Sequence, residues 1–61
     1  MLLRDFVDFC TCKISLCYLG QAGEILYNGY ASKVPGEFLN CNIATIYFFD
    51  GGIRIVLYKN F

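Results

Sequence analysis

The stretch "YFFDGGIRIVLY" (residues 47–58) is typical of a strand, a tight turn and a second strand. Its Asp-Gly dipeptide favours the two-residue turn of a β-hairpin. A half-buried hairpin in a small protein alternates apolar and polar residues. This one is apolar or aromatic at nearly every position. The fold therefore depends on what covers the second face of this hairpin.

The turn decides which side chains share a face. A loop of Asp50-Gly51 places Phe48 opposite Ile53, and a loop of Gly51-Gly52 shifts the pairing by two residues without changing either face. Both loops give an inner face of Ala44, Ile46, Phe48, Ile53, Ile55 and Leu57. The outer face then carries Ile43, Thr45, Tyr47, Phe49, Arg54, Val56 and Tyr58. This mixture is typical of the centre of a protein interface. We predict a contact surface made of Tyr47, Phe49, Arg54, Val56 and Tyr58.

The rest of the chain indicates a helix, two further strands and a break. Residues 2–10 place apolar side chains at helical spacing, namely Leu3, Phe6, Val7 and Cys10. Residues 13–19 alternate like a half-buried strand, residues 20–23 form a turn, and residues 24–31 are the return strand. Within that strand, Asn28-Gly29 is compatible with a second turn or a bulge.

Pro35 marks the clearest break, and residues 34–40 suit one helical turn because proline is favoured at the first helical position. We therefore predict an α+β fold in a single domain, residues 1–61. A short N-terminal helix packs on one face of a four-stranded antiparallel meander sheet, and a one-turn helix precedes the C-terminal hairpin.

The composition predicts self-association. A chain of 61 residues buries only about 60% of the surface that its unfolded form exposes. Because 57% of the residues are hydrophobic and 18% are aromatic, some apolar surface is left outside. Contiguous apolar patches on a protein surface mark interfaces. We expect a homodimer or a higher oligomer.

Charge and hydropathy argue against two classes of partner. Five basic and five acidic residues give zero net charge, and the basic residues are scattered, so we expect no binding to nucleic acid. No apolar run reaches the 18 or so residues of a membrane-spanning helix, so we expect no membrane partner. The N-terminus carries charges within its apolar run and does not resemble an export signal, which favours the cytoplasm.

Four cysteines, Cys10, Cys12, Cys17 and Cys41, allow three interpretations. Disulfides need an oxidising compartment, and structural zinc sites use ligand pairs separated by two to four residues. Here one pair is Cys-x-Cys and the other two cysteines are isolated in apolar segments. We favour free thiols that behave as small hydrophobic side chains, and we predict no metal site.

The sequence offers little for catalysis. It contains no histidine, which removes the commonest general base. Asp5 and Asp8 lie in the predicted helix, where carboxylates usually complement the helix dipole. We predict no enzymatic activity, no catalytic residue and no cofactor. The five tyrosines suit protein contact better than base stacking, because stacking sites also need a positive groove. If the hairpin's outer face serves the homodimer, a secondary interface is predicted at Tyr27, Tyr30 and Lys33.

Three segments, "LLRDF", "EILYNGYASKVPGEFLN" and "IATIYFFDGGIRIVLY", resemble very small proteins encoded by phages and prophages of Gram-positive bacteria. The shared pattern consists of Tyr27-x-Gly29-x-Ala31, Pro35, Leu39, Ile46-Tyr47 and Asp50-Gly51. The chain departs from that family in its cysteines and in its small number of acidic residues. The resemblance implies a non-enzymatic phage accessory protein, present in the host cytoplasm, that binds and inhibits a host protein of antiviral defence.

Two alternatives belong to other functional classes. One is an oligomeric sponge that sequesters a small nucleotide signal. It needs aromatic side chains and a cation for phosphate, which Arg54 and Lys59 beside Tyr47 and Tyr58 could supply. The other alternative is a structural assembly subunit.

Overall fold

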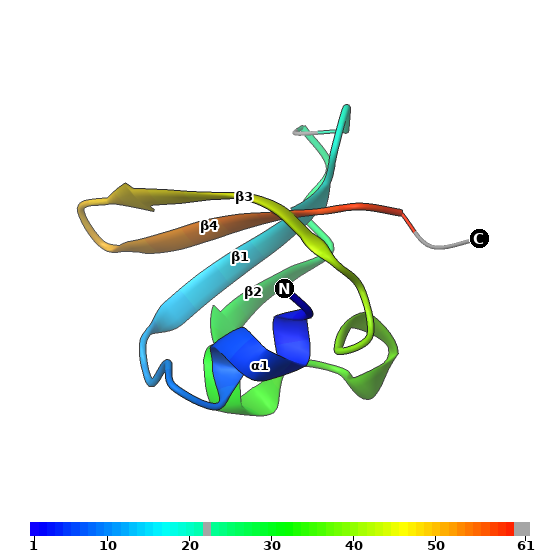
Figure 1. Ribbon diagram of the computed structural model, residues 1–61. Coiled ribbons are helices and arrows are strands. Elements are labelled where there is room, and N and C mark those ends of the chain that lie inside the picture. The colour runs from blue at the N-terminus through cyan, green and yellow to red at the C-terminus, as the bar shows by residue number, and fades with distance from the viewer. Residues whose placement is uncertain (22, 60–61) are drawn as a thin grey trace.

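The computed structural model describes residues 1–21 and 23–59. The sheet is built from β1 (Lys13–Tyr18), β2 (Tyr27–Tyr30), β3 (Ile43–Phe49) and β4 (Gly52–Leu57). Helix α1 (Leu3–Val7) and two 3-10 turns, η1 (Ala31–Lys33) and η2 (Gly36–Phe38), complete the elements. Figure 1 shows α1 and the segment after β2 on one side of the sheet, while the β1–β2 connection rises on the other. We call the α1 side the inner face and the opposite side the outer face.

The strands lie in the order β2-β1-β4-β3, and β1 pairs with β4 in parallel. The predicted all-antiparallel meander is therefore wrong. Both antiparallel hairpins, β1–β2 and β3–β4, form as predicted. The error lies in how they join, because a meander would place β3 beside β2. The observed sheet is mixed, with one parallel pair at its centre.

Hydrophobic burial explains this order. A meander would leave β1 and β4, the two most buried strands, at the edges of the sheet. In the observed order both are central, and burial runs without a break over residues 14–17 of β1 and 55–57 of β4. Burial on both faces is typical of strands inside a parallel arrangement. The shorter and more polar β2 takes one edge instead.

Residues 31–42 make the crossover that this order requires, and they also hold α1. The N–H of Leu3 donates to the carbonyl of Cys41 at 2.9 Å, and the N–H of Arg4 donates to Leu39 at 3.0 Å. These bonds satisfy donors that a helix start leaves unpaired, in place of a side-chain cap. The Arg4 guanidinium adds a bond from Nη2 to Asn40 Oδ1 at 2.9 Å.

The predicted one-turn helix near Pro35 appears as the 3-10 turn η2. The N-terminal helix is shorter than the predicted residues 2–10. The N–H groups of Phe9 and Cys10 bond to carbonyls three residues back, so the chain tightens there and leaves toward β1.

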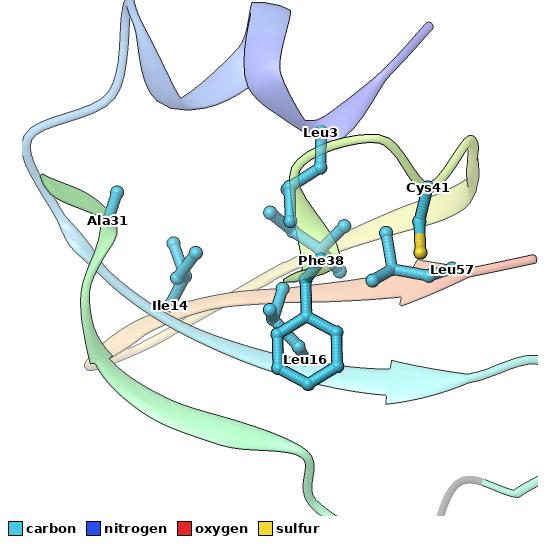
Figure 2. Packing of buried hydrophobic residues seen from close by; sticks show 8 residues of the cluster. Leu3, Ile14, Leu16, Ala31, Phe38, Cys41 and Leu57 are labelled. Carbon is cyan, nitrogen blue, oxygen red and sulfur yellow. The ribbon is translucent and has the colours of Figure 1, made fainter. Parts of the chain in front are cut away.

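The core lies between the inner face of the sheet and the layer formed by α1 and residues 31–42 (Figure 2). It contains Leu3, Ile14, Leu16, Ala31, Phe38, Cys41, Ile55 and Leu57. The rest of the predicted apolar stripe of α1, Phe6, Val7 and Cys10, packs against this cluster. Phe48 occupies an inner-face position but is 74% exposed. It lies two residues before the loop residue Asp50, and Figure 1 shows the β3–β4 turn extending away from α1.

Near its turn, the β3–β4 hairpin has the register of the first of the two predicted loops. Phe48 lies opposite Ile53, and Phe49 opposite Gly52, so the loop is Asp50-Gly51. Among the described residues only glycines have positive φ, and Gly51 has a φ of 97°. The turn is therefore not type I′, which needs positive φ at both loop residues.

A bulge changes the register at the start of β3. It falls between Ile43 and Thr45, so that Ile43 pairs with Leu57 and packs against the core. The prediction that Ile43 lies on the outer face is wrong, and Ile43 rather than Ala44 lies opposite Leu57. One extra residue in a strand reverses the face of every residue beyond it.

Asn28-Gly29 lies inside β2, paired with β1, and makes no turn. No helix within residues 1–21 and 23–59 is long and apolar enough to span a membrane.

Candidate binding face of the sheet

The outer face holds an open pocket with a volume of about 520 Å³. It lies between the β3–β4 hairpin and the start of the β1–β2 connection. The hairpin contributes Thr45, Tyr47, Phe49, Arg54 and Val56. Strand β1 and the segment that follows it contribute Cys17, Tyr18, Leu19 and Gly20.

The pocket has a packed floor and exposed walls. Cys17 and Val56 lie opposite each other on the parallel strands β1 and β4, and both are buried. Tyr47 and Phe49 form one wall and are 56% and 53% exposed. Leu19 and Gly20 form the other wall, where Gly20 adopts a φ of 84° that a side chain would disfavour. The N–H of Leu19 donates to the carbonyl of Leu57 at 2.8 Å, which fixes the base of this wall to β4.

Arg54 supplies the positive charge of the pocket. Its Nε lies 3.5 Å from Ser15 Oγ, a long hydrogen bond between neighbouring strands. No carboxylate within the described part of the chain forms an ion pair with Arg54. A guanidinium carries five N–H donors in a planar fork. The other donors of Arg54 are therefore available to an anionic group entering the pocket.

The structure brings together four of the five residues predicted for the primary contact surface. Tyr47, Phe49 and Arg54 line the pocket with accessible groups, and Val56 contributes only to its floor. Tyr58 follows the end of β4 and does not line the pocket, although half of its surface is exposed. Its N–H donates to the carbonyl of Asn42.

Cys17 and the Leu19–Gly20 wall were missed as members of this site. The sequence contained one signal for Cys17, because the alternation of residues 13–19 turns Ser15 and Cys17 away from the core side. Their position beside Arg54 and Val56 depends on the parallel pairing of β1 with β4. That pairing is absent from a meander.

The predicted secondary interface does not form one surface. Tyr27 and Tyr30 are three residues apart on β2, so their side chains leave opposite faces of the strand. Tyr27 packs against the core, and its Oη donates to the carbonyl of Tyr30 at 2.7 Å. The ring of Tyr30 is exposed and has Lys13 Nζ 5.5 Å from its centroid. Lys33 is exposed at the end of η1.

Of the two cations proposed for a nucleotide sponge, Arg54 lines the pocket and Lys59 does not. Lys59 Nζ lies 5.7 Å from the ring centroid of Tyr18, which is a pocket residue. The four cysteines are free thiols: Cys17 and Cys41 are buried, Cys10 is half-buried and Cys12 is exposed. Across residues 1–21 and 23–59, no three Cys, Asp or Glu side chains gather as a metal site would require.

Comparison with models of protein families, with curated proteins and with solved structures gives no significant match.

Proposed function

We propose that the protein acts without catalysis, by binding a partner protein through the outer-face pocket. The observation that supports this is an apolar, aromatic-walled pocket on the side of the sheet opposite α1, with one Arg that forms no ion pair with any described carboxylate. Aromatic and Arg side chains dominate the energetic centres of protein interfaces. The chemistry fits a partner that inserts an apolar or aromatic side chain and offers a carboxylate to Arg54.

The resemblance to small phage proteins supports a host protein as the partner. In this proposal the chain is a stoichiometric inhibitor that acts in the host cytoplasm and blocks a protein of antiviral defence. A binding protein of this kind needs only a rigid surface, and the floor of the pocket is built on the two central strands.

The test compares two variants with the same change of charge. Arg54→Glu reverses the cation of the pocket, and Lys33→Glu reverses an exposed cation at the end of η1. A partner captured from host lysate by the wild-type chain is purified and titrated against each variant by calorimetry. We expect Arg54→Glu to weaken binding by at least about tenfold, since it removes a charge-assisted hydrogen bond. Lys33→Glu should bind like wild type.

The reverse result would place the partner on the surface around Lys33 and overturn the proposal. Circular dichroism of both variants must match that of the wild-type protein, so that a lost affinity reports the surface and not the fold.

A nucleotide sponge is the second candidate, and the size of the pocket favours it. Small-molecule sites have volumes of about 300–1,000 Å³, and they combine apolar walls with a few polar groups. A bound nucleotide would raise the melting temperature of the wild-type chain, and Arg54→Gln would abolish that rise. If no mono-, di- or cyclic nucleotide shifts the melting temperature, the sponge is wrong.

A further inference from the structure

Strand β3 forms an edge of the sheet that lacks the usual protection. It is seven residues long and contains neither a charged residue nor proline. Natural proteins blunt such edges with lysine, proline, very short strands or bulges, because an edge presents unpaired backbone groups to other chains. The opposite edge, β2, is only four residues long. The single bulge of β3 lies at its start and leaves residues 45–49 regular.

Hydrogen bonds at the start of β3 fix which of its backbone groups face outward. The N–H of Tyr58 donates to the carbonyl of Asn42, and the N–H of Ile43 donates away from β4, to the carbonyl of Met1. The pair Ile43–Leu57 is therefore of the non-hydrogen-bonded kind. Hydrogen-bonded and non-hydrogen-bonded pairs alternate along an antiparallel ladder. Beyond the bulge, this alternation makes Thr45, Tyr47 and Phe49 the residues whose backbone bonds to β4. This agrees with Phe49–Gly52 closing a two-residue loop.

Ile46 and Phe48 consequently direct their N–H and C=O groups out of the sheet. Neither residue takes part in a turn, loop or cap hydrogen bond within the described part of the chain. Among residues 1–21 and 23–59, only the beginning of this edge is occupied, where Leu2 bridges to Asn42 and Leu3 bonds to Cys41. The stretch from residue 44 to residue 49 remains open.

We propose that a second copy of this chain pairs with this edge, β3 against β3 in antiparallel orientation, with Tyr47 facing the partner's Tyr47 across a two-fold axis. Only every second register is possible, because the outward N–H and C=O groups of Ile46 and Phe48 must pair with residues of the partner whose backbone groups also face outward. A register centred on Ile46 would bring the partner's Phe49 to Ile43, where Met1 already lies. Moving the centre to Tyr47 avoids this conflict.

The side chains in this register complement one another. On the inner face, the exposed ring of Phe48 meets the partner's Ile46. On the outer face, Phe49 meets the partner's Thr45. Pairs of an aromatic with a β-branched residue are favourable across antiparallel strands. No charged residue lies within residues 45–49, so no repulsion opposes the contact.

The pairing would join two four-stranded sheets into one, with both outer faces on the same side. Each pocket would then have the partner's Tyr47 next to its own aromatic wall. The inference does not depend on the proposed host target, because it rests on the backbone of β3. A contact of five residues on each side is small for a protein interface, so we expect a dimer that dissociates on dilution.

The test substitutes Tyr47, the residue that faces its own copy across the two-fold axis. Tyr47→Asp and Tyr47→Lys each place two like charges opposite one another, so each variant alone should dimerise several-fold to about tenfold more weakly than wild type. An equimolar mixture should recover a dimer of one Asp chain and one Lys chain. Sedimentation equilibrium over a range of concentrations measures both results. The same substitutions at Tyr30, an equally exposed residue on the β2 edge, should leave the dimer intact.

A second pair of variants tests the backbone hydrogen bonds of the proposed dimer. Phe48→Pro removes an outward N–H without breaking a bond to β4, and should abolish the dimer while the monomer stays folded. Phe48→Ala keeps that N–H and should weaken the dimer less. The inference is overturned if the wild type is monomeric at every concentration or if the Tyr47 variants fail to recombine. It is equally overturned if the Tyr30 variants weaken the dimer as strongly as the Tyr47 variants.

Discussion

Leu16 and Ile55 lie opposite each other on the parallel strands β1 and β4, and neither side chain is exposed to solvent. Each belongs to a different hairpin, so this pair lies at the junction that joins the two halves of the sheet. Both residues belong to the core cluster that also contains Leu3 of α1. Packing at this junction should therefore decide whether the sheet forms as a unit.

Truncation at this junction should be costly. Ile55→Ala leaves a cavity in the centre of the core, and such changes cost about 2–5 kcal/mol of unfolding free energy. A chain of this size has a total stability of roughly 3–9 kcal/mol, so the variant should lose a large fraction of its stability. Urea denaturation measures the difference.

Leu19→Ala is the matched control for that measurement. Leu19 is exposed, and its truncation should change stability by no more than about 0.5 kcal/mol. A loss below about 1 kcal/mol for Ile55→Ala would contradict the central position of this residue.

Local sequence signals predicted both hairpins because a turn and its flanking strands are close in the chain. Asp50-Gly51-Gly52 and the alternation around it fixed which side chains share a face, and the observed pairing of Phe48 with Ile53 is one of the two registers they allowed. The pairing of β1 with β4 is not local, and no turn residue specifies it. It follows from total burial, since residues 14–17 and 55–57 are buried on both faces and need central positions.

The candidate site was predictable to the same extent. Both possible two-residue loops give the same two faces, so Tyr47, Phe49 and Arg54 could be placed on one face without knowledge of the strand order. The bulge before Thr45 was not predictable, because residues 43–45 contain no glycine or proline to mark it. The N–H of Ile43 donates to Met1 and the carbonyl of Asn42 accepts from Tyr58, so two long-range bonds hold the chain just before the bulge.

A side chain at Gly29 should displace the ring of Tyr27. A Cβ at this position would lie 2.8 Å from Tyr27 Oη and 3.1 Å from Tyr27 Cζ. Gly29→Ala must displace the Tyr27 ring and break its bond to the carbonyl of Tyr30, which should cost about 1–3 kcal/mol. Thermal and urea unfolding measure the loss.

Gly36→Ala provides the comparison for Gly29→Ala. A Cβ at Gly36 meets nothing within 4 Å, and the residue does not have positive φ. This variant should be neutral or slightly stabilising, because alanine lowers the entropy of the unfolded chain. Equal effects at the two glycines would show that the Tyr27 ring does not lie over Gly29.

The four thiols should react with a thiol reagent in order of their exposure. Cys12 is exposed and should react first, followed by the half-buried Cys10. Cys17 and Cys41 should react only when the chain unfolds, because the reagent must reach the sulfur. Mass spectrometry of peptides after timed labelling assigns each site. Early labelling of Cys17 would mean that the floor of the outer-face pocket is open to solvent, in conflict with its burial.

Amide hydrogen exchange along β3 should alternate. The N–H groups of Tyr47 and Phe49 are bonded to β4 and should exchange slowly, whereas those of Ile46 and Phe48 face outward and should exchange fast in the dilute monomer. At high concentration, pairing with a second copy should slow exchange at Ile46 and Phe48 and leave the other two unchanged. Residue-resolved NMR exchange at two concentrations separates these effects. Uniform exchange at all four amides would contradict the assignment of which β3 residues bond to β4. Alternation that does not change with concentration would agree with the fold but contradict the dimer.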